Sequence, residues 1–191
     1  MKKYEYQRIG RLAEQLEIAK VDKHIIDQVM EGGINIRRST KPEDKAEWMR
    51  GAMLRMNKLL DIKTRKTVRE GCACCLGGQR LKISKKIVQE NESLEARIEA
   101  ADKAHYVGSV TMKESGEIIA RFDIQKSAPY HCYCLPKAAR PLPVTYCFCC
   151  GGHVKHHLQI ALGRELDCTT RSSALSSGGK FPCTFSFKIV E

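Results

Sequence analysis

The spacing of apolar residues changes once along the chain, and this change restricts the fold more than any other feature. Up to about residue 104, apolar side chains recur every three or four positions, as in LAEQLEIAKVDKHIIDQVM, which is typical of helices that bury one face. From Tyr106 onward they alternate with polar ones, which is typical of half-buried strands. The sequence therefore predicts an α+β fold, with N-terminal helices followed by an antiparallel sheet packed by helices.

The helical part is expected to form four helices. We place them at residues 12–30, at a segment that follows Pro42, at a segment that ends with the glycines of REGCACCLGG, and at about residues 81–104. The second carries a stripe of methionines, which at helical spacing we interpret as core. The third would place Cys72 and Cys75 on its inward face, and we interpret this pair as small buried apolar residues.

The second part is expected to form strands around one helix. A hairpin is predicted over residues 106–112 and 118–124, a third strand over YHCYCL, and a fourth strand or extended segment over VTYCFC. A helix would follow from Gly151 to Leu162 and end at Gly163. Two strands would finish the chain, the last with Phe181, Cys183, Phe185, Phe187 and Ile189 on one face.

The length of 191 residues suits one compact unit with a single good core. Within it we distinguish a helical region, residues 1–70, from an α+β region, residues 71–191. The formal net charge of +11 would attract an acidic partner such as nucleic acid. However, the basic residues are scattered, and no motif of the common RNA-binding modules is present. We therefore interpret the charge as solvated surface and do not expect nucleic acid as a partner.

The compartment is predicted from what the sequence lacks. The start, MKKYEYQRIGRLAEQ, has no apolar run and is unlike a signal peptide, and no stretch approaches the ~18 apolar residues of a membrane span. We expect a cytoplasmic protein that does not bind membranes. In that compartment ten cysteines indicate free thiols or metal ligands rather than disulfides. The sequence does not determine the oligomeric state, and a homodimer is one of the states that it allows.

The cysteines of the second part are spaced for metal binding. An alternating pattern would place Cys132 with Cys134, and Cys147 with Cys149, on common strand faces. Two such pairs on neighbouring strands could supply four thiolates to one tetrahedral ion, a set that zinc binds at about 2.3 Å from each sulfur. Zinc is therefore the expected cofactor. An iron–sulfur cluster fits less well, because there is no ferredoxin-type run of cysteines.

The helix after CFCC adds histidines and two further thiols. His153 and His157 lie one turn apart beside its apolar face, where they would line a ligand pocket or form ordinary boundary hydrogen bonds. The sequence HVKHH lacks the Glu of the HExxH motif, so a metalloprotease of that type is not expected. Cys149 and Cys150 would lie at the positive end of the helix dipole, which favours thiolates.

From Pro143 to the end, the chain resembles the bacterial 4-vinyl-reductase-like domain family. The matching stretches are PVTYC, a helix ending in ALGREL, and the final GGKFPCTFSF. The resemblance implies a small-molecule binder, and zinc-bearing relatives use cysteines that match Cys147 and Cys183. The two other ligand positions of those relatives have no acid or cysteine here, in the stretch Thr170 to Ser173. The ending is also similar to that of hydrolases of a cyclic aminothiazoline carboxylate, and CACCLGG resembles a group of uncharacterised cysteine-rich bacterial proteins.

Two functions follow from these patterns. The first is a cytoplasmic zinc-binding protein that binds a small, largely apolar ligand in a binding or sensor role. Its metal would be held by Cys147, Cys149 and Cys183, with Cys132 or Cys134 completing the set. The alternative is a thiol- or metal-dependent hydrolase of a small amide-like or thiazoline-like substrate, with Cys150 as nucleophile and His153 as base. A closed four-ligand site would indicate binding, whereas three protein ligands and a water would indicate catalysis.

Overall fold

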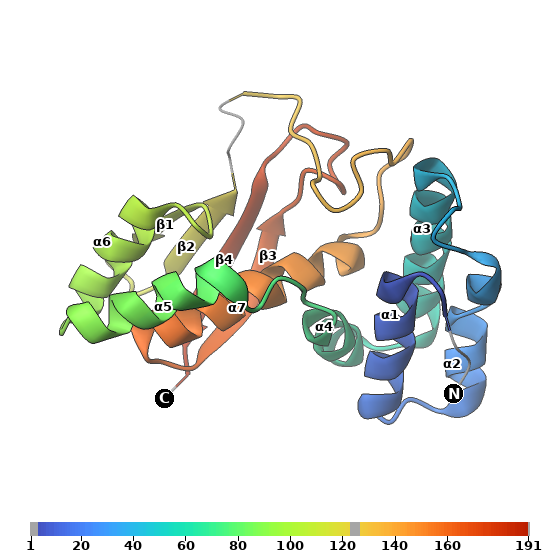
Figure 1. Ribbon diagram of the computed structural model, residues 1–191, viewed down its shortest axis with the longest axis horizontal. Helices are drawn as coiled ribbons and strands as arrows, with labels where there is room; N and C mark the ends of the chain where they lie inside the picture. The colour runs from blue at the N-terminus through green and yellow to red at the C-terminus, as the bar shows by residue number, and fades with distance from the viewer. Residues whose placement is uncertain (1–3, 123–126, 191) are drawn as a thin grey trace.

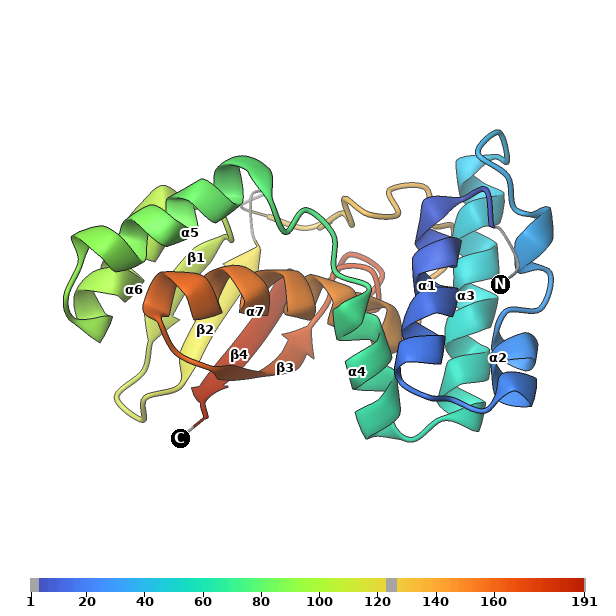
Figure 2. The same ribbon diagram turned by 60° about the horizontal axis from the view of Figure 1, so that its bottom comes forward.

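A bundle of helices lies at one end of the molecule, and a sheet covered by further helices lies at the other. The structure, a computed structural model, describes residues 4–122 and 127–190. Figures 1 and 2 show helices α1, α2 and α3 as a bundle at one end, the sheet with α5, α6 and α7 on one of its faces at the other, and α4 between them. The predicted α+β fold is confirmed. Within the two described ranges, no helix is both long and apolar enough to cross a bilayer.

Between residues 4 and 104 the structure has six α-helices where the sequence predicted four: α1 (Gln7–Ile18), α2 (Lys23–Val29), α3 (Pro42–Leu59), α4 (Ile62–Gly71), α5 (Gly78–Glu90) and α6 (Leu94–Ala104). The start of α3 at Pro42 is confirmed. The first predicted helix is divided because Lys20 adopts a left-handed φ of 54°. The fourth is divided because the Ser93 side chain accepts the backbone N–H of Ala96 and so starts a new helix.

The prediction that α4 continues through its cysteines was wrong. The helix ends at Gly71, and residues 73–76 form a loop before α5. The carbonyl oxygens of this loop accept hydrogen bonds from side chains of α1 and of the later helix α7 rather than from helical N–H groups. As a result Cys72 is buried while Cys75 is exposed, so the two do not share an inward face.

The sheet contains four antiparallel strands in the order β1-β2-β4-β3: β1 (Ser109–Met112), β2 (Ile118–Phe122), β3 (Leu166–Ser172) and β4 (Cys183–Ile189). The predicted hairpin is confirmed as β1 and β2, although the end predicted for it at Ile124 lies outside the described residues. The last strand is also confirmed; it pairs Phe185 with Ala120 of β2 and Phe187 with Cys168 of β3. Phe181 precedes it and is exposed.

Two predicted strands are absent from the described residues. The stretch YHCYCL is a loop; Pro129 and Pro136 stand directly before and after it, and neither has an N–H group with which a ladder could continue past the stretch. The stretch VTYC is a short 3-10 helix, η2 (Val144–Cys147), which leads directly into α7 (Phe148–Leu162). Helix α7 therefore starts three residues earlier than predicted, and Cys149 and Cys150 lie in its first turn. Its predicted end at Gly163 is confirmed.

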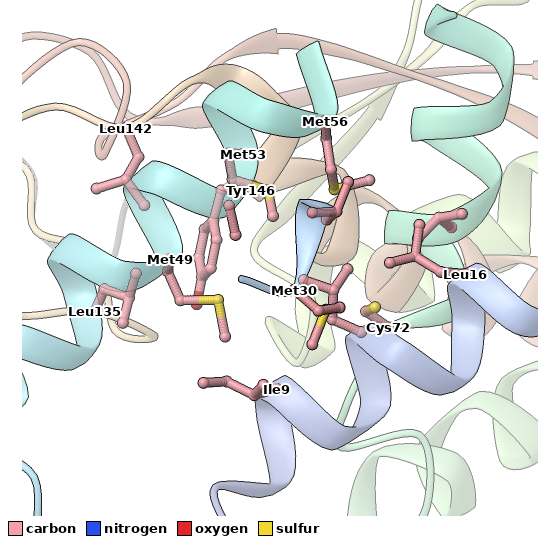
Figure 3. Packing of buried hydrophobic residues seen from close by; sticks show 14 of the residues in the cluster. Ile9, Leu16, Met30, Met49, Met53, Met56, Cys72, Leu135, Leu142 and Tyr146 are labelled. Carbon is pink, nitrogen blue, oxygen red and sulfur yellow. The ribbon is translucent and has the colours of Figure 1, made fainter. Parts of the chain in front are cut away.

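Buried apolar residues form two clusters that meet near the start of α7. The first joins α1 and α3 to η2, and Figure 3 shows Met49, Met53 and Met56 packed beside Tyr146. These methionines are core, as predicted. The second cluster lies between the sheet and helices α5 to α7 and centres on Phe185 and Phe187.

A pair of glycines allows the start of α7 to enter this junction. A Cβ atom at Gly152 would lie 2.6 Å from the carbonyl oxygen of Glu70 on α4, and one at Gly151 would lie 3.0 Å from the Sγ of Cys168 on β3. Only residues without side chains fit between the two elements. The glycines therefore place the thiols of Cys149 and Cys150 at the boundary of the two clusters.

Candidate functional site

Cysteines from four segments line one cavity of about 480 Å³. They come from the loop before α5, the loop after β2, the first turn of α7 and the start of β4, and they are Cys74, Cys75, Cys132, Cys134, Cys149, Cys150 and Cys183. The remaining wall is largely aromatic and apolar, with Phe122, Tyr130, Tyr133 and Ala174. A cavity of this size can hold a small molecule, since ligand pockets measure about 300–1,000 Å³.

A second cavity, of about 640 Å³, lies on the side of α1. It is more polar, with Gln7, Arg11 and Glu14 among the residues that line it. Arg8 and four cysteines, Cys74, Cys75, Cys134 and Cys149, line both cavities. These cysteines therefore form the partition between the apolar cavity and the polar one.

Four of the sulfurs form a connected network. Cys132 and Cys150 lie within hydrogen-bonding reach of Cys134, and Cys150 also reaches Cys149. As an acceptor of these bonds, with further help from the charge of Arg8, Cys134 has a pKa well below that of an ordinary thiol. The bond from Cys150 and the charge of Arg69 lower the pKa of Cys149 to about 7. The donors Cys132 and Cys150 have raised pKa values, because each donates to a neighbouring sulfur.

Two arginines face this network without acidic partners. Arg69 of α4 is 3% exposed, its Nη2 donates to the carbonyl oxygen of Tyr146 at 2.9 Å, and its buried Nε has no acceptor. Arg8 of α1 donates to the carbonyl oxygen of Cys134. Among the described residues, no carboxylate forms an ion pair with either arginine. A buried charge is costly unless it is paired. Besides the ring of Tyr146, whose centre lies 4.9 Å from the Cζ of Arg69, the nearby sulfurs are the groups that can balance these cations.

Three histidines of α7 hold the loop that carries Cys74 and Cys75. His153 Nδ1 lies 2.8 Å from the carbonyl oxygen of Cys74, His157 Nε2 lies 3.0 Å from that of Cys75, and His156 Nε2 lies 3.2 Å from that of Leu76. A carbonyl only accepts, so each of these nitrogens must carry the proton. His153 lines the apolar cavity, and its Nε2 is consequently left with a lone pair.

His157 serves a different purpose from the ligand contact that the sequence suggested. It is fully buried, and its Nδ1 lies 3.3 Å from the Oγ of Ser84, which in turn lies 3.1 Å from the hydroxyl of Tyr106. Among the described residues that line the two cavities, His157 does not appear. It connects the cysteine loop to Ser84 of α5 and, through Ser84, to Tyr106 in the segment between α6 and β1.

The burial of His157 predicts a dependence of stability on pH. Desolvation, with smaller contributions from His156 and Arg80, lowers its pKa below the ordinary 6.5 in the folded chain. Between that lowered value and 6.5 the unfolded chain binds more protons, so stability falls as the pH drops below 6.5. The variant His157→Gln keeps a donor for the carbonyl oxygen of Cys75. When the pH is lowered from about 7.5 to about 5, a range that spans the ordinary histidine pKa of about 6.5, we expect this variant to lose less stability than the wild type. Urea denaturation at the two pH values measures this.

A matched control for this prediction is His24→Gln, because His24 is exposed on α2. That variant should keep the full pH dependence of the wild type. If His157→Gln also keeps it, the acid sensitivity of the fold arises elsewhere.

The predicted metal ligands are brought together only in part. Cys132, Cys134 and Cys149 join the network, and Cys183 lines the same cavity. Cys147 is buried in the first cluster with its Sγ 2.8 Å from the Oγ of Ser173, and burial raises its pKa to about 12. Within the described part of the chain, no three His, Cys, Asp or Glu side chains are already arranged around a common point where a metal ion would bind.

Four residues of this site were not predicted from the sequence: Arg8, Arg69, Cys74 and Cys75. A signal for the two cysteines was present, because CACCLGG and CFCCGG share one pattern of cysteines and glycines. The structure brings these two segments to the same cavity wall. No local signal identified the arginines, since their position depends on how α1 and α4 pack.

Comparison with known proteins gives one match. Residues 9–179 match a family of unknown function, DUF6144. No curated protein and no solved structure matches the chain. The likeness of the last quarter of the chain to 4-vinyl-reductase-like domains therefore stays a prediction.

Proposed function

The chain belongs to the DUF6144 family of unknown function, and we propose that it is a metal-binding protein that holds a thiophilic transition-metal ion at Cys132, Cys134, Cys149 and Cys150. Zinc is the first candidate. The ion would lie in the wall of the 480 Å³ cavity, which would accept a small, largely apolar ligand. The observation that carries the proposal is the buried Arg69, which faces sulfurs rather than carboxylates.

The charges of the site favour a metal–thiolate centre over a group of neutral thiols. Four thiolates around a divalent ion carry a net charge of minus two. Arg8 and Arg69 supply two positive charges beside the same sulfurs. Neutral thiols would leave the buried Arg69 without a counter-ion, which is strongly unfavourable, and the half-buried Arg8 would lack one as well.

The unpaired Nε of Arg69 supports the same conclusion. A buried donor without an acceptor costs about 1–3 kcal/mol. A metal-bound thiolate accepts N–H groups, and such outer hydrogen bonds commonly orient metal ligands. Of the cysteines near Arg69, Cys149 acts on its charge most strongly. We assign Arg69 the role of holding that ligand and balancing its charge.

Binding requires a small rearrangement, because the four sulfurs are connected but do not yet surround one point. Cys149 and Cys150 belong to the first turn of α7, whereas Cys132 and Cys134 belong to the loop after β2. A cysteine side chain turns about a single torsion between staggered positions. The ion would therefore fasten this loop to α7 and close the cavity wall. An all-thiolate site leaves no open position, so the role of the ion would be structural.

The remaining cavity wall indicates the kind of ligand. Phe122, Tyr130 and Tyr133 present rings, and Ala174 adds a small apolar surface. A few polar groups, Arg80 among them, stand at the same wall and would orient a polar end of the ligand. Because the loop that carries Tyr133 also carries two of the proposed metal ligands, ligand binding and metal binding would be coupled. Such coupling suits a sensor.

The test is the metal content of protein purified without oxygen and then reloaded. We expect about one equivalent of zinc, the content of a single tetrahedral site, and cobalt substitution should give the absorption of tetrahedral thiolate ligation. The double variant Cys134→Ser/Cys149→Ser should lose both. Cys168→Ala is the matched control, because Cys168 lies in the second cluster, on β3. Metal-free wild type whose stability does not change on addition of zinc would overturn the proposal.

A second candidate function, a thiol-dependent hydrolase, is favoured by one observation. Cys149, whose pKa is lowered to about 7 by Cys150 and Arg69, and the lone pair of His153 Nε2 face the same cavity. The sequence assigned the nucleophile to Cys150, but its pKa is raised because it donates to Cys134 and Cys149. The thiolate of such an enzyme would be Cys149. Absence of metal together with alkylation that begins at Cys149 near neutral pH would favour this alternative.

A further inference from the structure

We infer that Cys74 and Cys75 form a second thiol site, which captures a thiophilic metal ion from solvent and passes it to the inner cysteines. This inference rests on the proposed metal-binding function. The inner cysteines are Cys132, Cys134, Cys149 and Cys150, which are all half-buried, whereas Cys74 and Cys75 are exposed. An ion that approaches from solvent therefore meets the exposed pair first.

The two sulfurs of the pair are close, and both residues line the same two cavities. Their Sγ atoms are 3.9 Å apart. Cys75 has a φ of 60°, in the left-handed region that residues other than glycine seldom adopt. Gly78, the first residue of α5, has a similar φ of 64°, but at Cys75 the same conformation is imposed on a residue with a side chain. Unfavourable backbone of this kind persists where the surroundings impose it, and it concentrates at functional sites.

The surroundings that impose it are the three histidines of α7. His153, His157 and His156 donate to the carbonyl oxygens of three consecutive residues, Cys74 to Leu76. From the other side Arg11 donates to the carbonyl oxygen of Ala73 at 2.6 Å. The backbone of the pair is thus fixed while both thiols stay free to bind. A fixed pair binds an ion without first losing conformational freedom.

The pair also lies next to the inner site. Cys74 and Cys75 line both cavities together with Cys134 and Cys149. Cys74 is close enough to Cys134 and Cys149 for their charges to act on it. Two exposed thiols supply half of a tetrahedral set, so the captured ion keeps water and exchanges readily. The inner site offers four sulfurs and two guanidinium groups, so transfer inward is favourable.

The transfer is an exchange of ligands and needs no oxidant. On capture, the thiols of Cys74 and Cys75 each lose a proton as they bind the ion. As an inner sulfur replaces one of them, an inner thiol gives its proton to water whereas an inner thiolate has none to give, and the displaced sulfur takes up a proton from water. The net result is that the pair returns to its starting state and the ion is held by the inner cysteines.

The rate of metal loading tests this inference. Metal-free protein is mixed rapidly with Cd²⁺, and the sulfur-to-cadmium absorption is followed. We expect Cys74→Ser/Cys75→Ser to load more slowly by about tenfold, the low end of the range over which association rates vary among variants of one site. The final amount of metal and the affinity in chelator competition should equal those of the wild type. Cys168→Ala, outside both cavities, should load at the wild-type rate.

Three outcomes would overturn the inference, and they differ in what they say of the proposed function. Equal loading rates would show that the pair plays no part in capture, while the inner site stands. Loss of metal from the double variant at equilibrium would show that the pair supplies resident ligands. A wild type that binds no metal would remove both proposals. Should the variant fail to fold, wild-type protein blocked with phenylarsine oxide, which bridges neighbouring thiols, should load slowly until a dithiol removes the reagent.

Discussion

Replacing Phe185 by alanine is expected to lower the free energy of unfolding by about 3–5 kcal/mol, as for other fully buried phenylalanines. Phe185 has no exposed surface and lies on β4 opposite Ala120 of β2. Its ring meets that of Phe122 edge to face, with 6.3 Å between the ring centres. A Cβ atom at Gly151 would lie 3.4 Å from its ring, so the start of α7 rests on it as well. Denaturant unfolding followed by circular dichroism measures the loss.

Phe181→Ala is the matched control for this substitution. The sequence placed Phe181 on the same face as Phe185, but the structure leaves it 58% exposed and outside β4. Its replacement should change stability by less than ~1 kcal/mol, as is usual at the surface. A loss of that small size at Phe185 instead would mean that the buried face of β4 is assigned wrongly.

The elements that were predicted correctly are those whose pattern is local. The start of α3 at a proline, the hairpin of β1 and β2, and the alternation in β4 all depend on neighbours a few residues apart. The breaks that were missed interrupt a helical pattern without changing its period. At Ser93 the cap is a single side-chain hydrogen bond, and at Lys20 the chain takes one left-handed step. The periodicity of apolar residues changes at neither position, so it indicates neither helix break.

The site was harder to predict because its contacts join distant segments. Cys132, Cys134 and Cys149 were expected to meet on paired strands; they meet across a loop and a helix turn instead. The loop at Cys74 takes its shape from histidines about eighty positions away, such as His153. No pattern in CACCLGG itself indicates those donors. The spacing of cysteines could therefore indicate which cysteines belong to the site. It could not predict the backbone conformation of the segments that contain them.

The electrostatics of the site depend on the same distant packing. Arg8 meets Cys134 because α1 packs against the cysteine loops, and Arg69 meets Cys149 because Gly152 lets α4 and α7 approach closely. In the sequence both arginines look like ordinary members of charged helices. The burial of Arg69 and the half-burial of Arg8 beside sulfurs distinguish a charged thiol centre from a cysteine-lined core. Whether a metal ion completes that centre stays a prediction.

Replacing Arg69 by methionine is expected to change metal binding and metal-free stability in opposite ways. Without the guanidinium group, the negative charge of a metal–thiolate centre loses one of its two neighbouring cations. Two unit charges about 4 Å apart interact by about 4 kcal/mol at the effective dielectric constant near a protein surface. Even a third of that energy corresponds to about tenfold in affinity, at about 1.4 kcal/mol per factor of ten. Competition with a chelator should therefore show zinc affinity weaker by about tenfold or more.

The metal-free protein should respond differently to the same change. Methionine fills a similar volume and removes both a buried charge and the unpaired Nε. Replacing buried charges by apolar residues is often neutral or stabilising. We therefore expect unfolding in the presence of a chelator to show unchanged or higher stability. Arg69→Lys, which keeps the charge, should retain most of the zinc affinity.

Arg97→Met provides the opposite control, since Arg97 donates to the carbonyl oxygens of Asn91 and Leu162, away from the cysteines. Its removal should lower stability and leave zinc affinity unchanged. If Arg69→Met instead behaves like Arg97→Met, then the role of Arg69 is its bond to Tyr146 and its packing. The sulfurs would in that case be neutral thiols that need no counter-ion, and the site would lose its strongest reason to hold a metal ion. The two variants thus distinguish a charged centre from an apolar one. For a charged centre, Arg69→Met lowers zinc affinity and does not lower metal-free stability, whereas Arg97→Met lowers stability and leaves zinc affinity unchanged.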